Sequence, residues 1–258
     1  DFDIVTSAKP QEIKSLFRNC ILIGKRFRLA HVRFGRKIIE VSTFRAGDIE
    51  EKTLIIQDNV WGDPKEDASR RDFTINGLFY DPEDQSIIDY VDGFPDTEKK
   101  LLRAIGTAHL RFTQDPVRMI RLLKFKARLL FDLDNETHSA LTKCKKMILK
   151  SSPARILEEL LRMLESGHSC NFIKLIHEYG ILELLIPKLA SFMEQDIKND
   201  IFLYLENADD MAKKSFKNSI DRSIFVSAII FPIFQKKIKE LSEKNKRLHL
   251  GIIAEEAR

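Results

Sequence analysis

Two carboxylates near the N-terminus, Asp1 and Asp3, are spaced as metal ligands on a strand would be. In an extended strand, residues i and i+2 project from the same face. Two carboxylates on one face repel each other unless a cation lies between them, and their hard oxygens suit Mg²⁺ or Mn²⁺. A pair of such ions can activate a hydroxyl nucleophile and stabilise a leaving phosphate. The same spacing is common in solvated turns, so it leaves both interpretations open.

Glu40 is a candidate third carboxylate. It stands in the run 38–44, where Ile39 and Val41 face one way and Glu40 and Ser42 the other. If this strand lies beside the strand of the two aspartates, three carboxylates converge and can hold two metal ions. The alternative is a Glu40 that faces solvent from one side of an antiparallel sheet.

The stretch 24–37 contains six basic residues and no acidic one, interleaved with aromatic side chains. Such a strip could bind a phosphate backbone, and the binding would weaken with added salt. The alternative is the solvated face of a hairpin. The candidate RNA-binding residues in it are Lys25, Arg26, Arg28 and Arg33.

A second polar cluster begins with the doubled arginine Arg70-Arg71. The planar guanidinium group matches phosphate oxygens, so these two side chains could meet a triphosphate. Asp72 could cap the helix-like run that follows. A plain capping segment would need Asp72 alone and would leave the doubled arginine unexplained.

The third cluster places Asp115, Arg118 and Arg121 three residues apart, which predicts one side of a helix. An acceptor and a donor on a rigid helix can match the polar edge of a nucleobase, and a further arginine can reach phosphate. An N-capped helix with i,i+3 ion pairs is the alternative.

The elements that must position these residues change character near residue 106. Before it, short alternating runs predict strands at 20–23, 27–34 and 38–44, the last two joined by a turn at Gly35, and a helix at 10–17. We expect a long loop from Ala46 to Asp67. After Gly106, apolar residues recur at helical spacing to the end of the chain. The expected fold class is α+β, with a mixed sheet and helices in domain 1–106 and an all-helical domain 107–258.

The amino-acid composition limits the classes of function that the chain can have. The 43 Lys+Arg against 39 Asp+Glu give a net charge of +4, which permits a nucleic-acid partner without requiring one. The three cysteines are far apart, which disfavours a disulfide framework or a zinc site and favours a reducing compartment. No apolar run approaches the roughly 20 residues of a bilayer crossing, so we expect no membrane association. The chain opens on Asp1-Phe2 without Met or a signal peptide, and we expect residues upstream to be missing.

Taken in order, four stretches resemble the class II nucleotidyltransferases of the polymerase-β superfamily, the family that contains bacterial poly(A) polymerases and CCA-adding enzymes. They are Asp1-Phe2-Asp3, Arg70 to Asn76, the Asp92-Gly93 region, and Asp115 to Arg121. The resemblance covers roughly residues 1–185. Within the family, the stretch from Leu22 to Val32 looks like the one that separates poly(A) polymerases from their CCA-adding relatives.

The resemblance implies a role for each cluster. Asp1 and Asp3 would bind the metal ions and Glu40 would be a third catalytic carboxylate. The triphosphate and ribose of the nucleotide would be held by Arg70, Arg71, Asp72 and Asn76, and its base edge by Asp115 and Arg118, with Arg121 behind them. The first domain would be the catalytic head and the second a neck and body that guides RNA. Two departures are the absent Gly-Gly-x-Val-Arg-Asp segment, which implies a head truncated at its N-terminus, and Gln114 in place of the usual Glu.

The expected activity is template-independent addition of AMP from ATP to RNA 3′ ends, with Mg²⁺ or Mn²⁺, as in mRNA polyadenylation in the cytoplasm. One alternative is a CCA-adding enzyme that uses the same metals and nucleotide pocket on tRNA. The other is a catalytically incomplete fragment that binds RNA.

Overall fold

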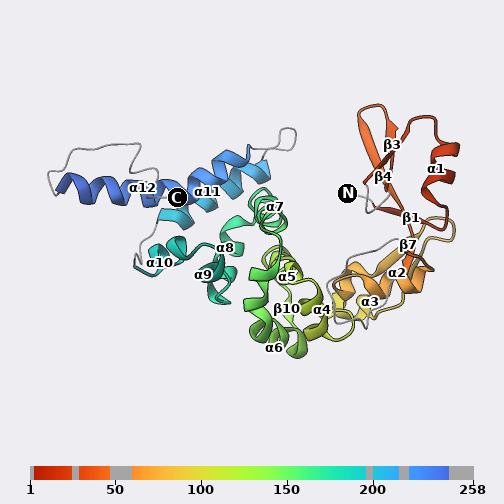
Figure 1. The fold of residues 1–258 in the computed structure, drawn as a ribbon, viewed down its shortest axis with the longest axis horizontal. Coiled ribbons are helices and arrows are strands. Elements are labelled where there is room, and N and C mark those ends of the chain that lie inside the picture. Colours follow the sequence, from red (N-terminus) through yellow and green to blue (C-terminus); the bar gives the residue numbers. More distant parts are fainter. Residues whose placement is uncertain (1–2, 25–28, 47–59, 196–199, 215–220, 244–258) are drawn as a thin grey trace. The chain divides into compact units, whose positions relative to one another are not determined.

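The computed structural model describes residues 3–24, 29–46, 60–195, 200–214 and 221–243 (Figure 1). The chain divides into two compact units, one formed by Asp1–Asp115 with Leu133–Thr137 and the other by Pro116–Asp132 with His138–Arg258. The first contains a mixed sheet with helices and the second is helical, which confirms the expected α+β class. The expected domain boundary after residue 106 stays a prediction.

Four strands form the main sheet of the first unit, in the order β1-β4-β3-β2. The predicted hairpin is present: β3 (Leu29–Phe34) and β4 (Lys37–Thr43) pair antiparallel around Gly35, whose φ of +60° suits a residue without Cβ. The strand β2 (Cys20–Ile23) extends the sheet on one side. On the other side, β1 (Ile4–Thr6) runs parallel to β4.

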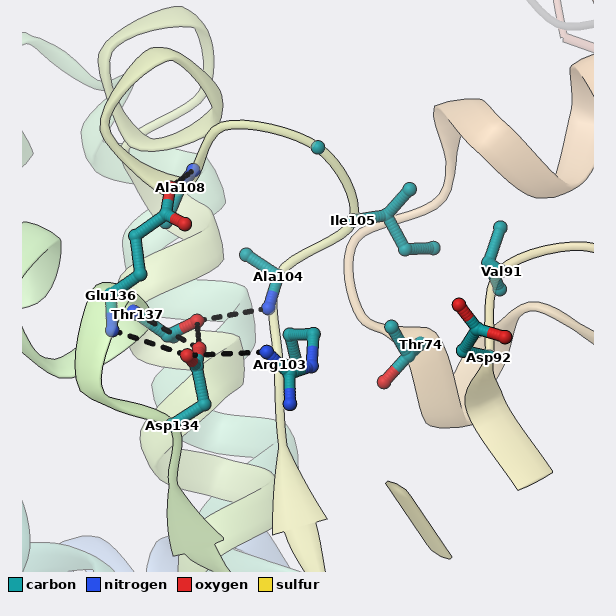
Figure 2. Close-up of a pocket in the computed structure, with 11 residues that line it drawn as sticks. Thr74, Val91, Asp92, Arg103, Ala104, Ile105, Ala108, Asp134, Glu136 and Thr137 are labelled. Atoms are coloured by element: carbon teal, nitrogen blue, oxygen red, sulfur yellow. Dashed lines mark hydrogen bonds and ion pairs between the residues drawn. The ribbon is translucent and has the colours of Figure 1, made fainter. Parts of the chain in front are cut away.

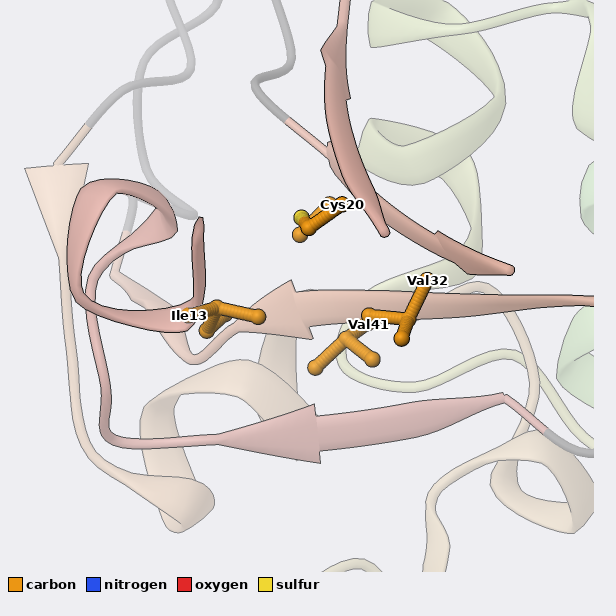
Figure 3. Packing of buried hydrophobic residues seen from close by; sticks show 5 residues of the cluster. Ile13, Cys20, Val32 and Val41 are labelled. Carbon is orange, nitrogen blue, oxygen red and sulfur yellow. The ribbon is translucent and has the colours of Figure 1, made fainter. Parts of the chain in front are cut away.

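One face of this sheet is covered by α1 (Pro10–Leu16), the predicted helix with proline in its first turn. Figure 3 shows Ile13 of α1 over the sheet, where the buried cluster is Ile13, Cys20, Ala30, Val32 and Val41. Because side chains alternate along a strand, the residues between these point the other way. That second face has exposed Ile21 and Ile38 on it, and it also contains Glu40.

The rest of the first unit consists of short elements that follow the sheet. They are β5 (Arg45–Ala46), β6 (Val60–Trp61), α2 (Pro64–Arg70), the 3₁₀ turn η1 (Thr74–Asn76), β7 (Leu78–Asp81), β8 (Ser86–Asp89), α3 (Gly93–Glu98), β9 (Leu101–Leu102) and α4 (Ala108–Gln114).

The expected loop from Ala46 to Asp67 is wrong at its C-terminal end, because β6 and the start of α2 lie within it. The signal for α2 was present in the sequence. Asp63 and Glu66 form a reciprocal capping box, with Asp63 Oδ1 accepting from the Glu66 N–H at 2.8 Å and Glu66 Oε2 accepting from the Asp63 N–H at 2.9 Å.

The second unit is mostly helical over its described residues, but the domain 107–258, expected to be all-helical, also contains the two-residue strand β10, which pairs with β9. From α5 onward the elements are α5 (Val117–Leu129), β10 (Asp132–Leu133), α6 (Asn135–Cys144), the 3₁₀ turn η2 (Lys145–Lys150), α7 (Pro153–Leu164), α8 (Ser169–Glu178), α9 (Leu182–Leu185), α10 (Pro187–Gln195), α11 (Asp200–Lys214) and α12 (Arg222–Glu243). Fully buried Ile120, Leu123 and Phe172 lie in its core, on α5 and α8. None of the described helices is both long and apolar enough to cross a bilayer.

Replacing Ile13 by Ala should destabilise the first unit, because Ile13 is 3% exposed and joins α1 to the sheet. The expected loss is about 2–5 kcal/mol in the free energy of unfolding, measured by urea denaturation. Leu16→Ala is the matched control on the same helix, since Leu16 is 74% exposed. Equal losses in the two variants would contradict this packing.

Candidate active site

Two of the predicted catalytic carboxylates belong to neighbouring segments of the sheet, because Asp3 directly precedes β1 and Glu40 lies within β4. The parallel register pairs Ile4 with Val41, and the same register continued back by one residue places Asp3 beside Glu40. Both residues are exposed, on the face of the sheet away from α1. Asp1 lies outside the described residues. The β1–β4 pairing thus meets the condition that the strand of Glu40 lies beside the segment of the aspartates. The two exposed carboxylates are hard oxygen donors of the kind that fits Mg²⁺.

His31 completes a row of residues across this face. It is the antiparallel partner of Glu40, and its Nε2 lies 3.2 Å from Glu40 Oε1. The imidazole side chain is 20% exposed and the Glu40 side chain 53%. Sequence reasoning missed this contact, although alternation along the two strands of a hairpin could have placed both side chains on one face.

Of the four predicted RNA-binding residues, Arg33 is described and the other three, Lys25, Arg26 and Arg28, lie outside the described residues. Arg33 is exposed on β3, two residues after His31. Its side chain therefore projects from the same face as Glu40. This places one cation of the basic strip on the carboxylate face.

Arg71, the second residue of the doubled arginine, is held by Asp67, a buried residue of α2 that sequence analysis did not single out. Asp67 is 4% exposed, and its Oδ2 accepts from Nε and Nη2 of Arg71 at 3.2 and 3.1 Å. Its Oδ1 accepts from the Arg45 N–H at 3.2 Å. Arg71 also donates to the Asn76 carbonyl at 2.9 Å and lies over the ring of Phe79. Asp67 thus joins the strand after β4 to the arginine segment.

A second buried group that the sequence did not reveal, Arg111 of α4, supports the same segment. Arg111 is 2% exposed, and its Nη2 donates to the carbonyls of Ser69 and Arg71. These carbonyls lie at the C-terminal end of α2, where helical carbonyls lack intrahelical partners and the helix dipole favours a cation. Arg111 therefore fixes the backbone around Arg70, the half-buried last residue of α2.

Asp72 and Asn76 bind each other, contrary to the expectation that Asp72 caps a helix. Asp72 Oδ1 accepts from Asn76 Nδ2 and from the Phe73 N–H, both at 2.9 Å. The segment after Asp72 is the single 3₁₀ turn η1, which begins after Phe73 and has no side-chain cap. The contact closes the loop after the arginines into a rigid turn.

The third predicted cluster does not lie on one helix. Asp115 follows α4 as its C-terminal cap in a non-helical conformation, and α5 begins after Pro116. The physical reason is the proline, because the residue before Pro avoids the helical conformation. Arg118 lies half-buried in the first turn of α5. Arg121 lies one turn further on, with Nη1 at 3.5 Å from Glu159 Oε1 of α7.

The third sequence stretch of the resemblance packs against η1. A Cβ at Gly93 would lie 2.2 Å from the Thr74 carbonyl oxygen, so only glycine fits this approach. Burial opposes ionisation of Asp89, yet backbone N–H groups of Phe94, Val91 and Gly93 at the start of α3 outweigh it and lower the pKa of its carboxyl. The Asp92-Gly93 stretch thus has a structural explanation.

A pocket of about 220 Å³ lies next to this stretch and is separate from the predicted site residues (Figure 2). Its polar groups bind one another: Arg103 bridges Asp96 at 2.9 Å and Asp134 at 3.4 Å, and Asp134 in turn accepts from the backbone N–H groups of Glu136 and Thr137 at 3.1 Å. The hydrogen bond to Asp96 is the main cause that raises the pKa of Arg103. These contacts attach the start of α6 to the segment that follows β9.

Asp67→Asn should destabilise the first unit, because the amide keeps the shape of the carboxylate and loses its charge-assisted bonds to Arg71. The expected loss is about 1.5–3 kcal/mol in the free energy of unfolding, from urea denaturation. Glu83→Gln, in the exposed turn between β7 and β8, is the control. If Asp67→Asn matches the control in this measurement, Asp67 does not support the arginine segment.

Two family models match the chain. One, described as the poly A polymerase head domain, matches residues 1–103, and the other, described as the probable RNA and SrmB-binding site of polymerase A, matches residues 130–193. The first range contains the carboxylates and the arginine segment. The second begins after α5 and ends in α10.

Curated relatives and solved structures agree with these models. The chain is 34% identical to poly(A) polymerase I of Escherichia coli O6:H1, over 96% of this chain and 57% of that protein. It is 39% identical to the CCA-adding enzyme of Lactobacillus johnsonii, over 63% of this chain and 41% of that one. The crystal structure of the Bacillus stearothermophilus CCA-adding enzyme in complex with CTP has the same fold, with a TM-score of 0.63 and 23% identity over 93% of this chain and 60% of that chain. This chain spans about half the length of the curated relatives it matches. It belongs to the nucleotidyltransferase family that contains bacterial poly(A) polymerases and CCA-adding enzymes.

Proposed function

We propose that the protein adds AMP from ATP to the 3′ ends of RNA without a template. The observation that supports this most directly is the register that places Asp3 beside Glu40 on the open face of the sheet. Family membership adds that such a head acts on nucleotides. The activity, the substrates and the partners are proposals for the whole protein.

The metal-binding residues we propose are Asp1 and Asp3, with Glu40 as a third catalytic carboxylate. Mg²⁺ or Mn²⁺ bound there would lower the pKa of the RNA 3′ hydroxyl and neutralise charge on the departing pyrophosphate. The positions of Asp3 and Glu40 in the sheet determine where the negative charge of the proposed site lies. Asp3 directly precedes β1, and Glu40 lies within β4, so the backbone of the sheet sets their spacing.

The triphosphate and ribose contacts we propose lie in the segment from Arg70 to Asn76. Arg111 fixes the backbone beside Arg70, and Asp67 holds the guanidinium of Arg71. Asp72 and Asn76 close the following turn on each other. We therefore assign to Arg70 a contact with the phosphates of the nucleotide. To Arg71, Asp72 and Asn76 we assign nucleotide contacts that depend on the fixed geometry of this segment.

The base contacts we propose are Asp115 and Arg118, with Arg121 behind them. Asp115 can accept from an exocyclic amine while Arg118 donates to a ring nitrogen. Adenine and cytosine share an amine beside a ring acceptor, whereas guanine and uracil present a carbonyl beside an N–H. The ion pair of Arg121 with Glu159 ties the start of α5 to α7 and so steadies the helix that contains Arg118.

RNA contacts are proposed for Arg33 on the carboxylate face, together with Lys25, Arg26 and Arg28. We also propose that residues 1–106 act as the catalytic head and residues 107–258 as the neck and body that guides RNA. The family model of an RNA-binding site over residues 130–193 supports the second assignment. Cytoplasmic mRNA polyadenylation fits the three buried cysteines with free thiols, which suit a reducing compartment.

The extent of the similarity favours poly(A) polymerase over a CCA-adding enzyme. The match to the Escherichia coli poly(A) polymerase covers 96% of the chain, whereas the match to the Lactobacillus johnsonii CCA-adding enzyme covers 63%. The CCA-adding activity stays the second candidate because those relatives reach higher identity, 39%, where they align.

Nucleotide incorporation into a labelled RNA tests the function in the complete protein. We expect long tails with ATP alone, and a rate lower by roughly 10²–10³-fold or more in Asp3→Asn with unchanged RNA affinity. Asp84→Asn, an exposed aspartate between β7 and β8, is the control. Dependence on CTP with a stop after a few additions would favour the CCA-adding enzyme, and RNA binding without incorporation would favour the RNA-binding fragment. Near wild-type rates in Asp3→Asn would remove Asp3 from the chemistry.

Base selection should depend on Asp115. We expect rejection of GTP and UTP by the wild type on the order of 10⁴-fold, because the wrong bases leave buried groups unpaired. Asp115→Ala should relax this rejection with a smaller loss of overall rate than Asp3→Asn. The measurement is kcat/KM for all four nucleotides, with Asp132→Ala, a highly exposed aspartate, as the control. Equal discrimination by wild type and Asp115→Ala would exclude the assignment.

A further inference from the structure

His31 lies opposite the proposed catalytic carboxylate Glu40 across the β3–β4 strand pair. The antiparallel register pairs the two residues directly, and Nε2 of the imidazole lies 3.2 Å from Oε1 of the carboxylate. At this distance the ring nitrogen and the carboxylate oxygen are in direct polar contact. In the tautomer that has its hydrogen on Nε2, the imidazole can donate to Glu40.

The two partners differ in how firmly they are held. The His31 side chain is 20% exposed, so its neighbours on the sheet restrict it, whereas the Glu40 side chain is 53% exposed. A glutamate on an exposed strand face has three rotatable bonds and loses considerable conformational entropy when its carboxylate is fixed. Contact with a restrained imidazole can supply that restriction before any substrate binds.

The order Asp3, Glu40, His31 across the sheet also explains why Glu40 needs a hydrogen-bond donor on the side of β3. Glu40 has Asp3 on one side by the β1–β4 register and His31 on the other by the β3–β4 register. The two carboxylates repel each other. A donor on the far side of Glu40 draws one carboxylate oxygen toward β3, so the other oxygen stays available on the side of Asp3.

We propose that His31 is a positioning residue that orients the Glu40 carboxylate for nucleotidyl transfer. This inference rests on the function proposed above. His31 acts through Glu40 and contacts neither the nucleotide nor the RNA.

The test uses the complete protein with His31→Leu, which removes the donor and keeps an apolar side chain on the strand, and with His31→Gln, whose amide N–H can replace Nε2–H. Single-turnover AMP addition should fall about 10–100-fold in His31→Leu with unchanged KM for ATP, the range found when the partner of a metal-site ligand is removed. His31→Gln should recover most of the rate. In a Glu40→Gln background, His31→Leu should cause no further loss.

Ile21→Ala is the matched control, because Ile21 pairs with His31 from the other side and is exposed on the same face. It should keep the wild-type rate and thermal stability. A wild-type rate in His31→Leu, or an equal loss in the Glu40→Gln background, would overturn the inference. So would a failure of His31→Gln to recover any rate.

A second readout does not depend on activity. Binding of Mn²⁺ alone, followed by the electron paramagnetic resonance signal of the free ion, should be about 10-fold weaker in both His31→Leu and Glu40→Gln than in Ile21→Ala. If the wild type transfers no nucleotide, the proposed function fails, and the Mn²⁺ affinities of the variants then test the positioning role of His31 separately. Equal Mn²⁺ binding by His31→Leu and Ile21→Ala would overturn the positioning role.

Discussion

The buried carboxylate of Asp67 connects the two parts of the head that the proposed chemistry needs. It accepts from the backbone of Arg45, two residues after the strand that contains Glu40, and from the guanidinium of Arg71. A carboxylate with 4% exposure is costly unless its oxygens are satisfied by donors. Asp67 meets that requirement only when β5 and the end of α2 lie side by side. The relative placement of the carboxylates and the arginines is therefore a consequence of satisfying one buried charge.

The sheet that presents the carboxylates is asymmetric. One face packs Val32 and Val41 under α1, and the other presents Glu40, His31 and Arg33. A register shift of one residue would exchange the two sets, so the same alternation that forms the core fixes the direction of the site. The strands β3 and β4 therefore contribute residues both to the buried core and to the proposed site.

Local periodicity and capping signals predicted much of the fold. The hairpin around Gly35, the helix with Pro10 and the change to helices after residue 106 follow from patterns within a few residues. The start of α2 could also have been predicted, because Asp63 and Glu66 form a capping box. The spacing from Asp115 to Arg118 predicts one helix, but Pro116 keeps the residue before it out of the helical conformation, so Asp115 lies outside α5.

The candidate site was predictable in its residue types and less so in its supports. The pairing of β1, which follows Asp3, with the strand of Glu40 agrees with the metal-site hypothesis. In contrast, the Arg45 partner of Asp67 is 22 residues away, and the Ser69 and Arg71 partners of Arg111 are 42 and 40 residues away. Such contacts depend on tertiary packing, which periodicity does not encode. A charged residue in an otherwise ordinary helix gives no local sign that it is buried.

The buried cysteines give each unit an internal chemical probe. Cys20 lies in the core between α1 and the sheet, while Cys144 and Cys170 are buried in the helical unit. Burial is the largest cause that raises the pKa of the Cys170 thiol, so the reactive thiolate is rare in the folded state. Alkylation at each cysteine therefore requires local or global opening of the unit that surrounds it. Labelling rates at Cys20 and Cys170 thus separate the opening of the head from the opening of the helical unit, without any added reporter group.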